Sequence, residues 1–206
     1  MNRPQYYQDV ITQKSWQFLQ EIKKTVPFIL IGGWAVYLYT NALKSKDIDI
    51  IIDYADLPTL EKLGKIYKNE RLLKYELKKE EVDVDIYLPH YSQVGIPAEI
   101  INKHISKVET FTLPEKEILV ITKLAAYENR KISAKGQKDK LDILSLILLK
   151  DFDLNKLREY ALRYKQIACF QSLIVIVETT YEAEELGLNR HGFARRKSEI
   201  LMKLGK

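Results

Sequence analysis

Two aspartates, Asp47 and Asp49, alternate with isoleucines in an apolar run that ends at Asp53. In a β-strand, successive side chains point to opposite faces, so the two carboxylates would project together from one face. Carboxylates this close raise each other's pKa unless a cation neutralises them. A hard divalent ion such as Mg²⁺ takes oxygen ligands and leaves positions open for substrate phosphates. The spacing therefore favours a metal-binding strand over a polar edge strand.

A second pair of acids, Asp83 and Asp85, alternates with apolar residues in Val82–Leu88. A charged turn separates this run from Arg71–Leu77, so the two segments are predicted to form a hairpin. If Val82–Leu88 lies beside the first acidic strand, as many as four carboxylates converge. Like charges on one sheet face destabilise it, which argues against a purely structural role.

Gly32 and Gly33 end a predicted buried strand, Phe28–Ile31, and open a predicted helix from Trp34 to Asn41. Glycine has no β-carbon, so its backbone can adopt unusual dihedrals and let a phosphate approach the free N–H groups of the helix start. A glycine pair alone is more often an ordinary turn. Here the aspartates that follow the glycine pair favour a phosphate-binding role for it.

The remaining pattern predicts an α/β region followed by helices. Asp56 is expected to cap a helix whose apolar face reaches Ile66-Tyr67, and Lys107–Leu113 is a further candidate strand. We expect an α/β core at residues 1–113 and a helical domain at 114–206. The predicted helices, the first of them in the α/β core, are Gln5–Thr25, Pro114–Arg130, Gln137–Lys150, Leu154–Tyr164, Ile167–Leu186 and Arg190–Leu204.

Bulk properties exclude several classes of protein. The 206 residues are 46% hydrophobic and 30% charged, as in a soluble globular protein, and no apolar run could cross a membrane. The first residues lack the apolar core of a secretion signal, and the single cysteine, Cys169, excludes an intrachain disulfide, so we expect a cytoplasmic protein. The basic segment Arg190–Lys206 is read as a solvated helix face in preference to a nucleic-acid contact.

In this order, Gly32-Gly33, Asp47-Ile48-Asp49 and a later acid resemble the nucleotidyltransferase superfamily, whose fold is shared with polymerase beta. The segment GGWAVYLYT is especially similar to antibiotic nucleotidyltransferases and AbiEii-type toxins, and the resemblance extends from Ile29 to about Leu149. It implies a small mixed β-sheet core flanked by helices, with a C-terminal helical region. It also implies a nucleoside triphosphate substrate and Mg²⁺ or Mn²⁺ as cofactor.

The resemblance assigns catalytic roles to the acids. Asp47 and Asp49 would hold the metal against the phosphates, and Asp83 or Asp85 would be the third acid. We favour Asp85, which directly precedes Ile86-Tyr87-Leu88, and include it among the metal ligands. A second metal, or the third acid acting as a base, would activate the acceptor hydroxyl. Many relatives carry an arginine and a threonine before the first aspartate, whereas Ser45 stands here without that arginine, which leaves the substrate class open.

Later charged residues complete the candidate nucleotide site. Lys123 is the only charged residue between Ile118 and Tyr127, so it either snorkels outward or meets an anion such as triphosphate. Asp139 is expected in a solvated ion pair, and Asp142 as a structural or substrate-orienting partner of a lysine. The predicted nucleotide-binding residues are Gly32, Gly33, Ser45, Lys123, Lys138 and Asp142.

The leading hypothesis is an enzyme that transfers a nucleoside monophosphate to a hydroxyl of RNA, a small molecule or a protein. The alternative is a toxin–antitoxin component that acts by protein or RNA binding and keeps a residual transferase site, with a cognate antitoxin as partner. A third reading is a nucleic-acid-binding helical module. The histidines His90, His104 and His191 lie in unrelated contexts and offer no catalytic triad.

Overall fold

The computed structural model describes residues 9–187 and 189–205. The chain forms two compact units, Gln5–Glu115 and Lys116–Lys206. The predicted helix at Gln5–Thr25 begins at Asp9 in the described residues, and its first four predicted residues lie outside them.

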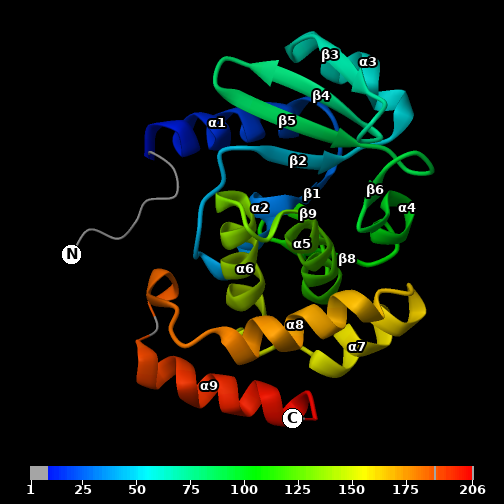
Figure 1. The fold of residues 1–206 in the computed structure, drawn as a ribbon. Coiled ribbons are helices and arrows are strands. Elements are labelled where there is room, and N and C mark those ends of the chain that lie inside the picture. The colour runs from blue at the N-terminus through cyan, green and yellow to red at the C-terminus, as the bar shows by residue number, and fades with distance from the viewer. Residues whose placement is uncertain (1–8, 188, 206) are drawn as a thin grey trace. The chain divides into compact units, whose positions relative to one another are not determined.

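A seven-stranded sheet forms the centre of the first unit, in the order β3-β4-β5-β2-β1-β9-β8 (Figure 1). β2 pairs in parallel with β5, as β1 does with β9, and the other neighbours are antiparallel. The predicted mixed sheet is thus confirmed. The strands are β1 Ile29–Ile31, β2 Ile48–Ile51, β3 Ile66–Asn69, β4 Lys74–Lys79, β5 Val82–Tyr87, β8 Ile105–Val108 and β9 Phe111–Pro114. A small separate sheet pairs β6 Gln93–Val94 with β7 Ile96–Pro97.

Helices cover this sheet through apolar side chains. Leu19 and Ile22 of α1 are fully buried, and α1 contacts β5. Trp34 of α2 is 2% exposed and donates its indole N–H to Ser15 Oγ at 2.9 Å, so it is a core residue, as burial of its large ring favours. The helices of this unit are α1 Asp9–Thr25, α2 Gly32–Thr40, α3 Leu57–Leu60 with the 3₁₀ turns Tyr54–Asp56 and Glu61–Leu63, and α4 Ala98–Ile101.

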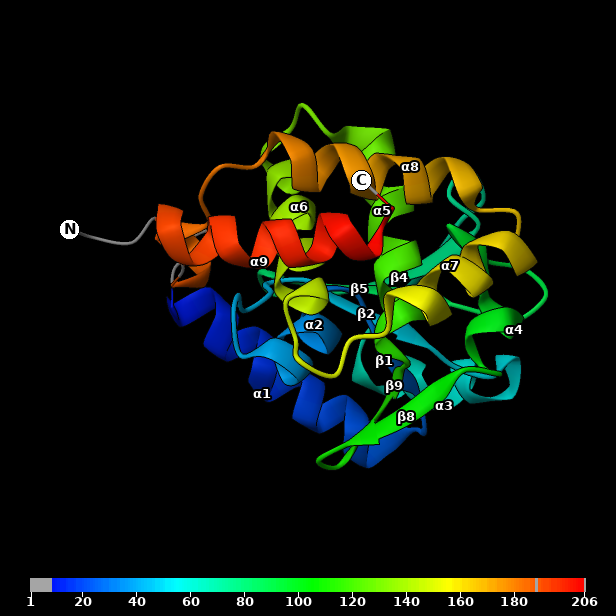
Figure 2. The ribbon, with the colours of Figure 1, turned by 90° about the horizontal axis from the view of Figure 1, so that it is seen from below.

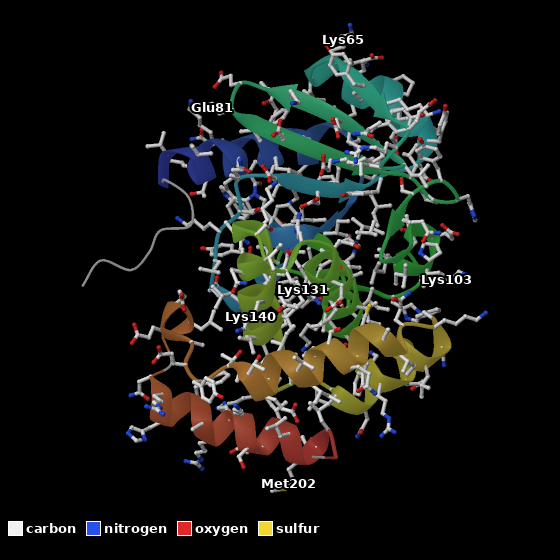
Figure 3. All side chains as sticks on the ribbon, viewed as in Figure 1. Lys65, Glu81, Lys103, Lys131, Lys140 and Met202 are labelled. Carbon is white, nitrogen blue, oxygen red and sulfur yellow. The ribbon has the colours of Figure 1, made fainter. Side chains whose placement is uncertain are left out.

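Several boundaries in the first unit differ from the predictions. The helix after Asp56 is a single turn, because Ile66 and Tyr67 belong to β3, which pairs with β4. The predicted hairpin exists, but its first strand begins at Lys74, after a turn. Its own turn lies at Glu80 and Glu81, where Glu81 projects outward (Figure 3). The segment Lys107–Leu113 is not one strand, since Glu109 adopts a left-handed backbone (φ 52°) and reverses the chain between β8 and β9.

The described part of the second unit is helical: α5 Lys116–Arg130, α6 Ala134–Ile147, α7 Leu154–Arg163, α8 Ile167–Thr179 and α9 Arg190–Lys203. Side-chain caps begin three of these helices. Ser133 accepts from the N–H of Gly136, Asp153 from that of Asn155, and Asn189 from that of Gly192.

Within this unit α5 contacts α6, α7 and α8, and α8 and α9 run side by side in both views (Figures 1 and 2). α8 ends before the predicted Leu186, because Thr180 takes an extended backbone and donates its hydroxyl to the Ile176 carbonyl. Among the described residues, we find no helix with the length and apolar character needed to cross a bilayer.

Candidate active site

The predicted acids lie on or next to two adjacent parallel strands, β2 and β5 (Figure 1). Asp49 in β2 is registered opposite Asp85 in β5, and Asp47 directly precedes β2. The flanking Ile48 and Ile50 are fully buried, whereas Asp47 and Asp49 are partly exposed. The alternation of acids and isoleucines therefore separates a polar sheet face from a core face.

Gly32 brings the start of α2 against Asp49. Its φ of +67° lies in the left-handed region, and a β-carbon built there would stand 2.0 Å from Oδ2 of Asp49. Only glycine combines that backbone with that close approach at low cost. The Asp49 carboxylate thus lies next to the N-terminal end of α2, where helix N–H groups favour negative charge.

A lysine that sequence reasoning missed lies beside Asp85. Lys74 Nζ is 2.6 Å from Asp85 Oδ1 and 3.1 Å from Glu76 Oε1. Asn69 Nδ2 donates to the same Glu76 oxygen at 2.8 Å. Lys74 and Glu76 alternate in β4 as the aspartates do in β5, so the hairpin pattern held a signal that they share a face.

Burial and charge act against each other on these groups. Burial raises the pKa of Asp85; Lys74 lowers it, and the negative charges of Glu76 and Asp47 raise it again. Burial lowers the pKa of Lys74, but Asp85 and Glu76 outweigh burial, so its pKa is raised overall. The hydrogen bond from Asn69 is the largest cause that lowers the pKa of Glu76. Lys74 and Glu76 are therefore held in their charged forms, whereas the pKa of Asp85 is raised overall.

Asp83 differs from Asp85 in its surroundings. Its side chain is 53% exposed and lies 3.8 Å from Lys78 Nζ. Asp85 is 25% exposed and is the acid registered opposite Asp49. On the loop before β2, Ser45 is buried, and Lys46 Nζ is 3.9 Å from Asp47 Oδ1.

The fit of a divalent metal depends on Asp47 and Asp49. In the chain as described, no group of three or more His, Cys, Asp or Glu side chains is arranged to hold a metal ion. Mg²⁺, however, is usually bound through one or two carboxylates together with water and substrate phosphates. Asp47, which directly precedes β2, and Asp49 within it suit that mode, and a ligand set that also includes Asp85 stays a prediction.

Comparison with known proteins adds independent evidence. Residues 10–182 match the family described as "Nucleotidyltransferase of unknown function (DUF6036)". The chain belongs to this nucleotidyltransferase family. The resemblance to AbiEii-type toxins stays a prediction.

Solved structures share the nucleotidyltransferase fold. The crystal structure of ANT(2'')-Ia in complex with adenylyl-2''-tobramycin is 11% identical, with a TM-score of 0.52, over 78% of this chain and 99% of that one. A putative nucleotidyltransferase from H. pylori is 15% identical, with a TM-score of 0.51, over 95% of this chain and 96% of that one. No curated protein matches the chain. These similarities establish the fold of this nucleotidyltransferase.

The other predicted nucleotide-binding residues of this nucleotidyltransferase form an ionic network on α5 and α6. Lys123 Nζ is 2.7 Å from Asp142 and 3.2 Å from Asp139, and Lys138 Nζ is 3.2 Å from Asp142. Arg130 makes two hydrogen bonds to Asp139. Lys123 does not snorkel, because its side chain is only 9% exposed, and Asp139, at 2%, is not in a solvated pair. Whether this network binds nucleotide stays a prediction.

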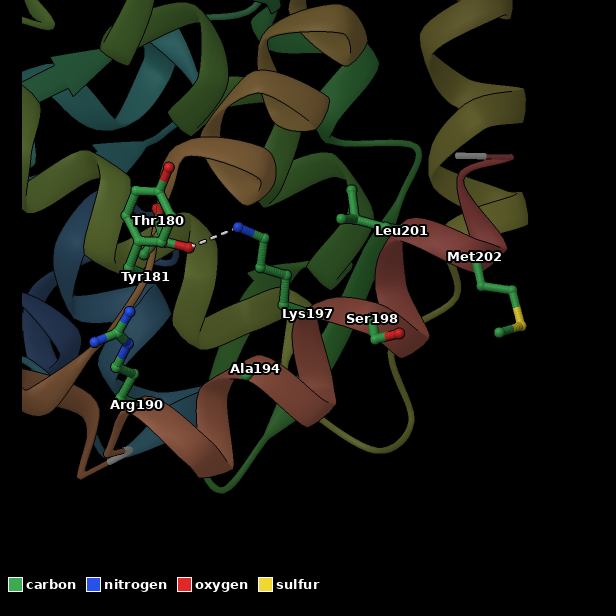
Figure 4. A pocket seen from close by; sticks show the side chains of 8 residues that line it. All are labelled: Thr180, Tyr181, Arg190, Ala194, Lys197, Ser198, Leu201 and Met202. Carbon is green, nitrogen blue, oxygen red and sulfur yellow. Dashed lines mark hydrogen bonds between the residues drawn. The ribbon is translucent and has the colours of Figure 1, made fainter.

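A cavity of about 530 Å³ lies along α9 (Figure 4). Lys197 points across it and donates to the carbonyls of Glu178 and Thr180, the latter at 3.0 Å. This lysine of the predicted basic face is therefore bound to backbone. The cavity is lined by Thr180, Tyr181, Arg190, Ala194, Lys197, Ser198, Leu201 and Met202, a set that offers no carboxylate for metal-dependent chemistry.

Proposed function

We propose that this nucleotidyltransferase moves a nucleoside monophosphate from a nucleoside triphosphate to a hydroxyl acceptor in a metal-dependent reaction. Asp47 and Asp49 hold Mg²⁺ or Mn²⁺, and Asp85 is the base. The observation that carries this proposal is the register that sets Asp49 opposite Asp85 while the Asp49 carboxylate rests against Gly32. Membership in a nucleotidyltransferase family supports the reaction class.

The reaction forms one phosphorus–oxygen bond and breaks another. The acceptor hydroxyl oxygen attacks the α-phosphorus, and the bond from that phosphorus to the bridging oxygen of the β-phosphate breaks, so pyrophosphate leaves with the electron pair. The hydroxyl proton passes to a carboxylate oxygen of Asp85. When bound, the divalent ion neutralises charge on the phosphates. Positioning and charge neutralisation supply most of the catalysis in phosphoryl transfer.

Gly32 and Gly33 at the start of α2, together with the loop before β2, complete the proposed substrate site. Gly32 and Gly33 begin α2, where free backbone N–H groups can donate to phosphate oxygens. The Lys46 ammonium, 3.9 Å from Asp47, adds positive charge on the same loop as Ser45. We assign Ser45 as a hydroxyl donor to the triphosphate.

A small molecule is the first acceptor class to test. The crystal structure of ANT(2'')-Ia contains an adenylylated tobramycin, so this fold can accommodate a nucleotide joined to a small hydroxyl compound. RNA and protein acceptors follow in the same assay. An antitoxin partner stays a prediction, and transfer of label to a protein in extract is the result that would favour a toxin–antitoxin role.

The test uses each of the four ribonucleoside triphosphates, labelled at the α-phosphate, with Mg²⁺ or Mn²⁺ and three acceptor sources: aminoglycosides, total RNA and cell extract. Wild type and Asp53→Asn are expected to transfer label, because Asp53 is exposed at the end of the same run. Asp49→Asn and chelated wild type are expected to transfer none. Equal labelling by Asp49→Asn, or no labelling by wild type with any acceptor, would overturn the proposal.

A further inference from the structure

A row of carboxylates crosses three strands at one level of the sheet. Asp49 in β2 is registered with Asp85 in β5, and Asp85 in turn with Glu76 in β4. Lys74 lies two residues before Glu76 on the same strand, so its side chain projects from the same face. The Lys74 ammonium group therefore approaches Asp85 from the β4 side, whereas Asp49 lies on the β2 side.

The contacts of Lys74 fix it on Asp85. Its Nζ is 2.6 Å from Asp85 Oδ1 and 3.1 Å from Glu76 Oε1, and its side chain is only 12% exposed. Glu76 is itself held by Asn69 at 2.8 Å. A short contact between ammonium and carboxylate, supported by a second anchored carboxylate, has the geometry of a strong charge-assisted pair. Asp85 is thus already paired with one of the protein's own cations.

The position of Lys74 disfavours a divalent ion on Asp85 and leaves Asp47 and Asp49 for one. Asp47 and Asp49 lie on the β2 side of the row, whereas the Lys74 ammonium is 2.6 Å from Asp85 Oδ1. A second divalent ion placed on Asp85 would lie close to the Lys74 ammonium and be repelled by it.

We propose that Lys74 takes the place of a second metal ion, so that this nucleotidyltransferase works with a single Mg²⁺ bound by Asp47 and Asp49. Lys74 acts through Asp85, whose carboxylate it holds toward the acceptor, and is therefore a positioning residue. The inference rests on the proposed function, since it assumes the triphosphate site at Asp47 and Asp49. It is consistent with the described residues, which form no three-acid metal cluster.

The number of bound ions tests this role directly. Mn²⁺ binding is measured by electron paramagnetic resonance and calorimetry, with the protein saturated by a nucleoside triphosphate carrying a methylene group between its α- and β-phosphates. Wild type is expected to bind one ion per chain and Lys74→Met two, because the freed Asp85 becomes a ligand. Lys74→Arg keeps the positive charge and is expected to bind one.

Lys78→Met is the matched control. Lys78 lies on the same strand and pairs with Asp83 at 3.8 Å, but its side chain is 66% exposed. Its removal takes away one positive charge without freeing Asp85, so this variant is expected to bind one ion. A second ion in Lys78→Met would show that loss of charge anywhere on β4 is sufficient, and would overturn the specific role of Lys74.

Other outcomes separate this inference from the proposed function. Two ions in wild type, or one ion in a folded Lys74→Met, would overturn the role of Lys74 while leaving metal-dependent transfer intact. No ion bound with the triphosphate in wild type would overturn the proposed function itself. If Lys74→Met does not fold, Asp85→Asn decides: one ion bound with unchanged affinity supports the inference, and a lost or weakened ion overturns it.

Discussion

The carboxylate row of the sheet and the ionic network on α5 and α6 use the same residue types at different depths. Lys74 of the row pairs with Asp85 and Glu76, Lys46 lies 3.9 Å from the neighbouring Asp47, and Asp47 and Asp85 remain 22% and 25% exposed. In the network, three cations face two carboxylates, and Asp139 and Asp142 are 2% and 1% exposed. The row keeps Asp47 and Asp85 within reach of solvent, whereas the network encloses its acids completely.

The difference shows why charged residues cannot be given a function before their partners are known. Carboxylates within reach of solvent suit a metal and its phosphate ligands. Enclosed pairs satisfy one another, and breaking them costs folding free energy. We therefore expect substitutions in the row to act on turnover and substitutions in the network to act on stability.

The largest expected effect comes from Asp85. Asp85→Asn should lower kcat by about 10²–10⁴-fold, the usual contribution of a positioned general base. Asp83→Asn should cost far less, because Asp83 is exposed and pairs with Lys78. Steady-state kinetics with the acceptor identified by labelling measures both variants. A greater loss of kcat in Asp83→Asn than in Asp85→Asn would make Asp83 the third acid and would contradict the assignment of Asp85 as the base.

Removal of Asp139 should give the largest loss of stability. Asp139→Asn removes the carboxylate that Lys123 and Arg130 share, and breaking a buried pair costs about 3–5 kcal/mol. Glu159→Gln is the control, because Glu159 and Arg163 form an exposed pair worth about 0–1 kcal/mol. Denaturant unfolding measures both. Equal stability of the two variants would contradict a structural role for the network.

Gly32→Ala should lower kcat/KM by about 10²-fold, because a displacement of about 1 Å at a catalytic group can cost that much. The new β-carbon would occupy the position of the Asp49 carboxylate. Gly187→Ala controls for backbone strain, since Gly187 has a similar φ of +73° but a β-carbon there would meet no described atom within 4 Å. Both should lose about 1–3 kcal/mol of stability from that strain. Equal kcat/KM values would show that Gly32 does not position Asp49.

Local alternation allowed part of this architecture to be predicted from sequence. The period-two pattern correctly placed Asp49 and Asp85 on strands, although Asp47 lies just before β2, and the mixed α/β fold and the pairing of β2 with β5 are confirmed. Lys74 was not recognised, because its partner lies across a hairpin and cross-strand register is not visible in one strand's sequence. The start of β4 was also predicted three residues too early.

In the helical unit, the environment of Asp139 and the end of α8 were predicted wrongly. Asp139 carries the pattern of a surface residue, since charges on helices usually face water. Its burial follows from packing of α5 against α6, which no local spacing reveals. The predicted α8 ran too far for a different reason: the backbone becomes extended at Thr180, which ends the helix.

The smallest effect is a change in the pH dependence of stability. Burial lowers the pKa of Lys138; Asp142 raises it and Lys123 lowers it further, and an uncharged Lys138 would balance the network. Between this lowered pKa and the ordinary value of 10.5, the unfolded chain binds more protons, so stability rises with pH in that window. Lys138→Met should lose this rise, a difference on the order of 1 kcal/mol.

Lys131→Met is the control for this last prediction, because Lys131 is 55% exposed and pairs only weakly, at 3.5 Å, with Glu128. Urea unfolding of wild type and both variants at several pH values below 10.5 measures the slopes. Wild type and Lys131→Met should become more stable relative to Lys138→Met as pH rises. Parallel slopes in all three would mean that Lys138 titrates alike in both states, and a raised KM for triphosphate in Lys138→Met alone would assign this lysine to substrate binding instead.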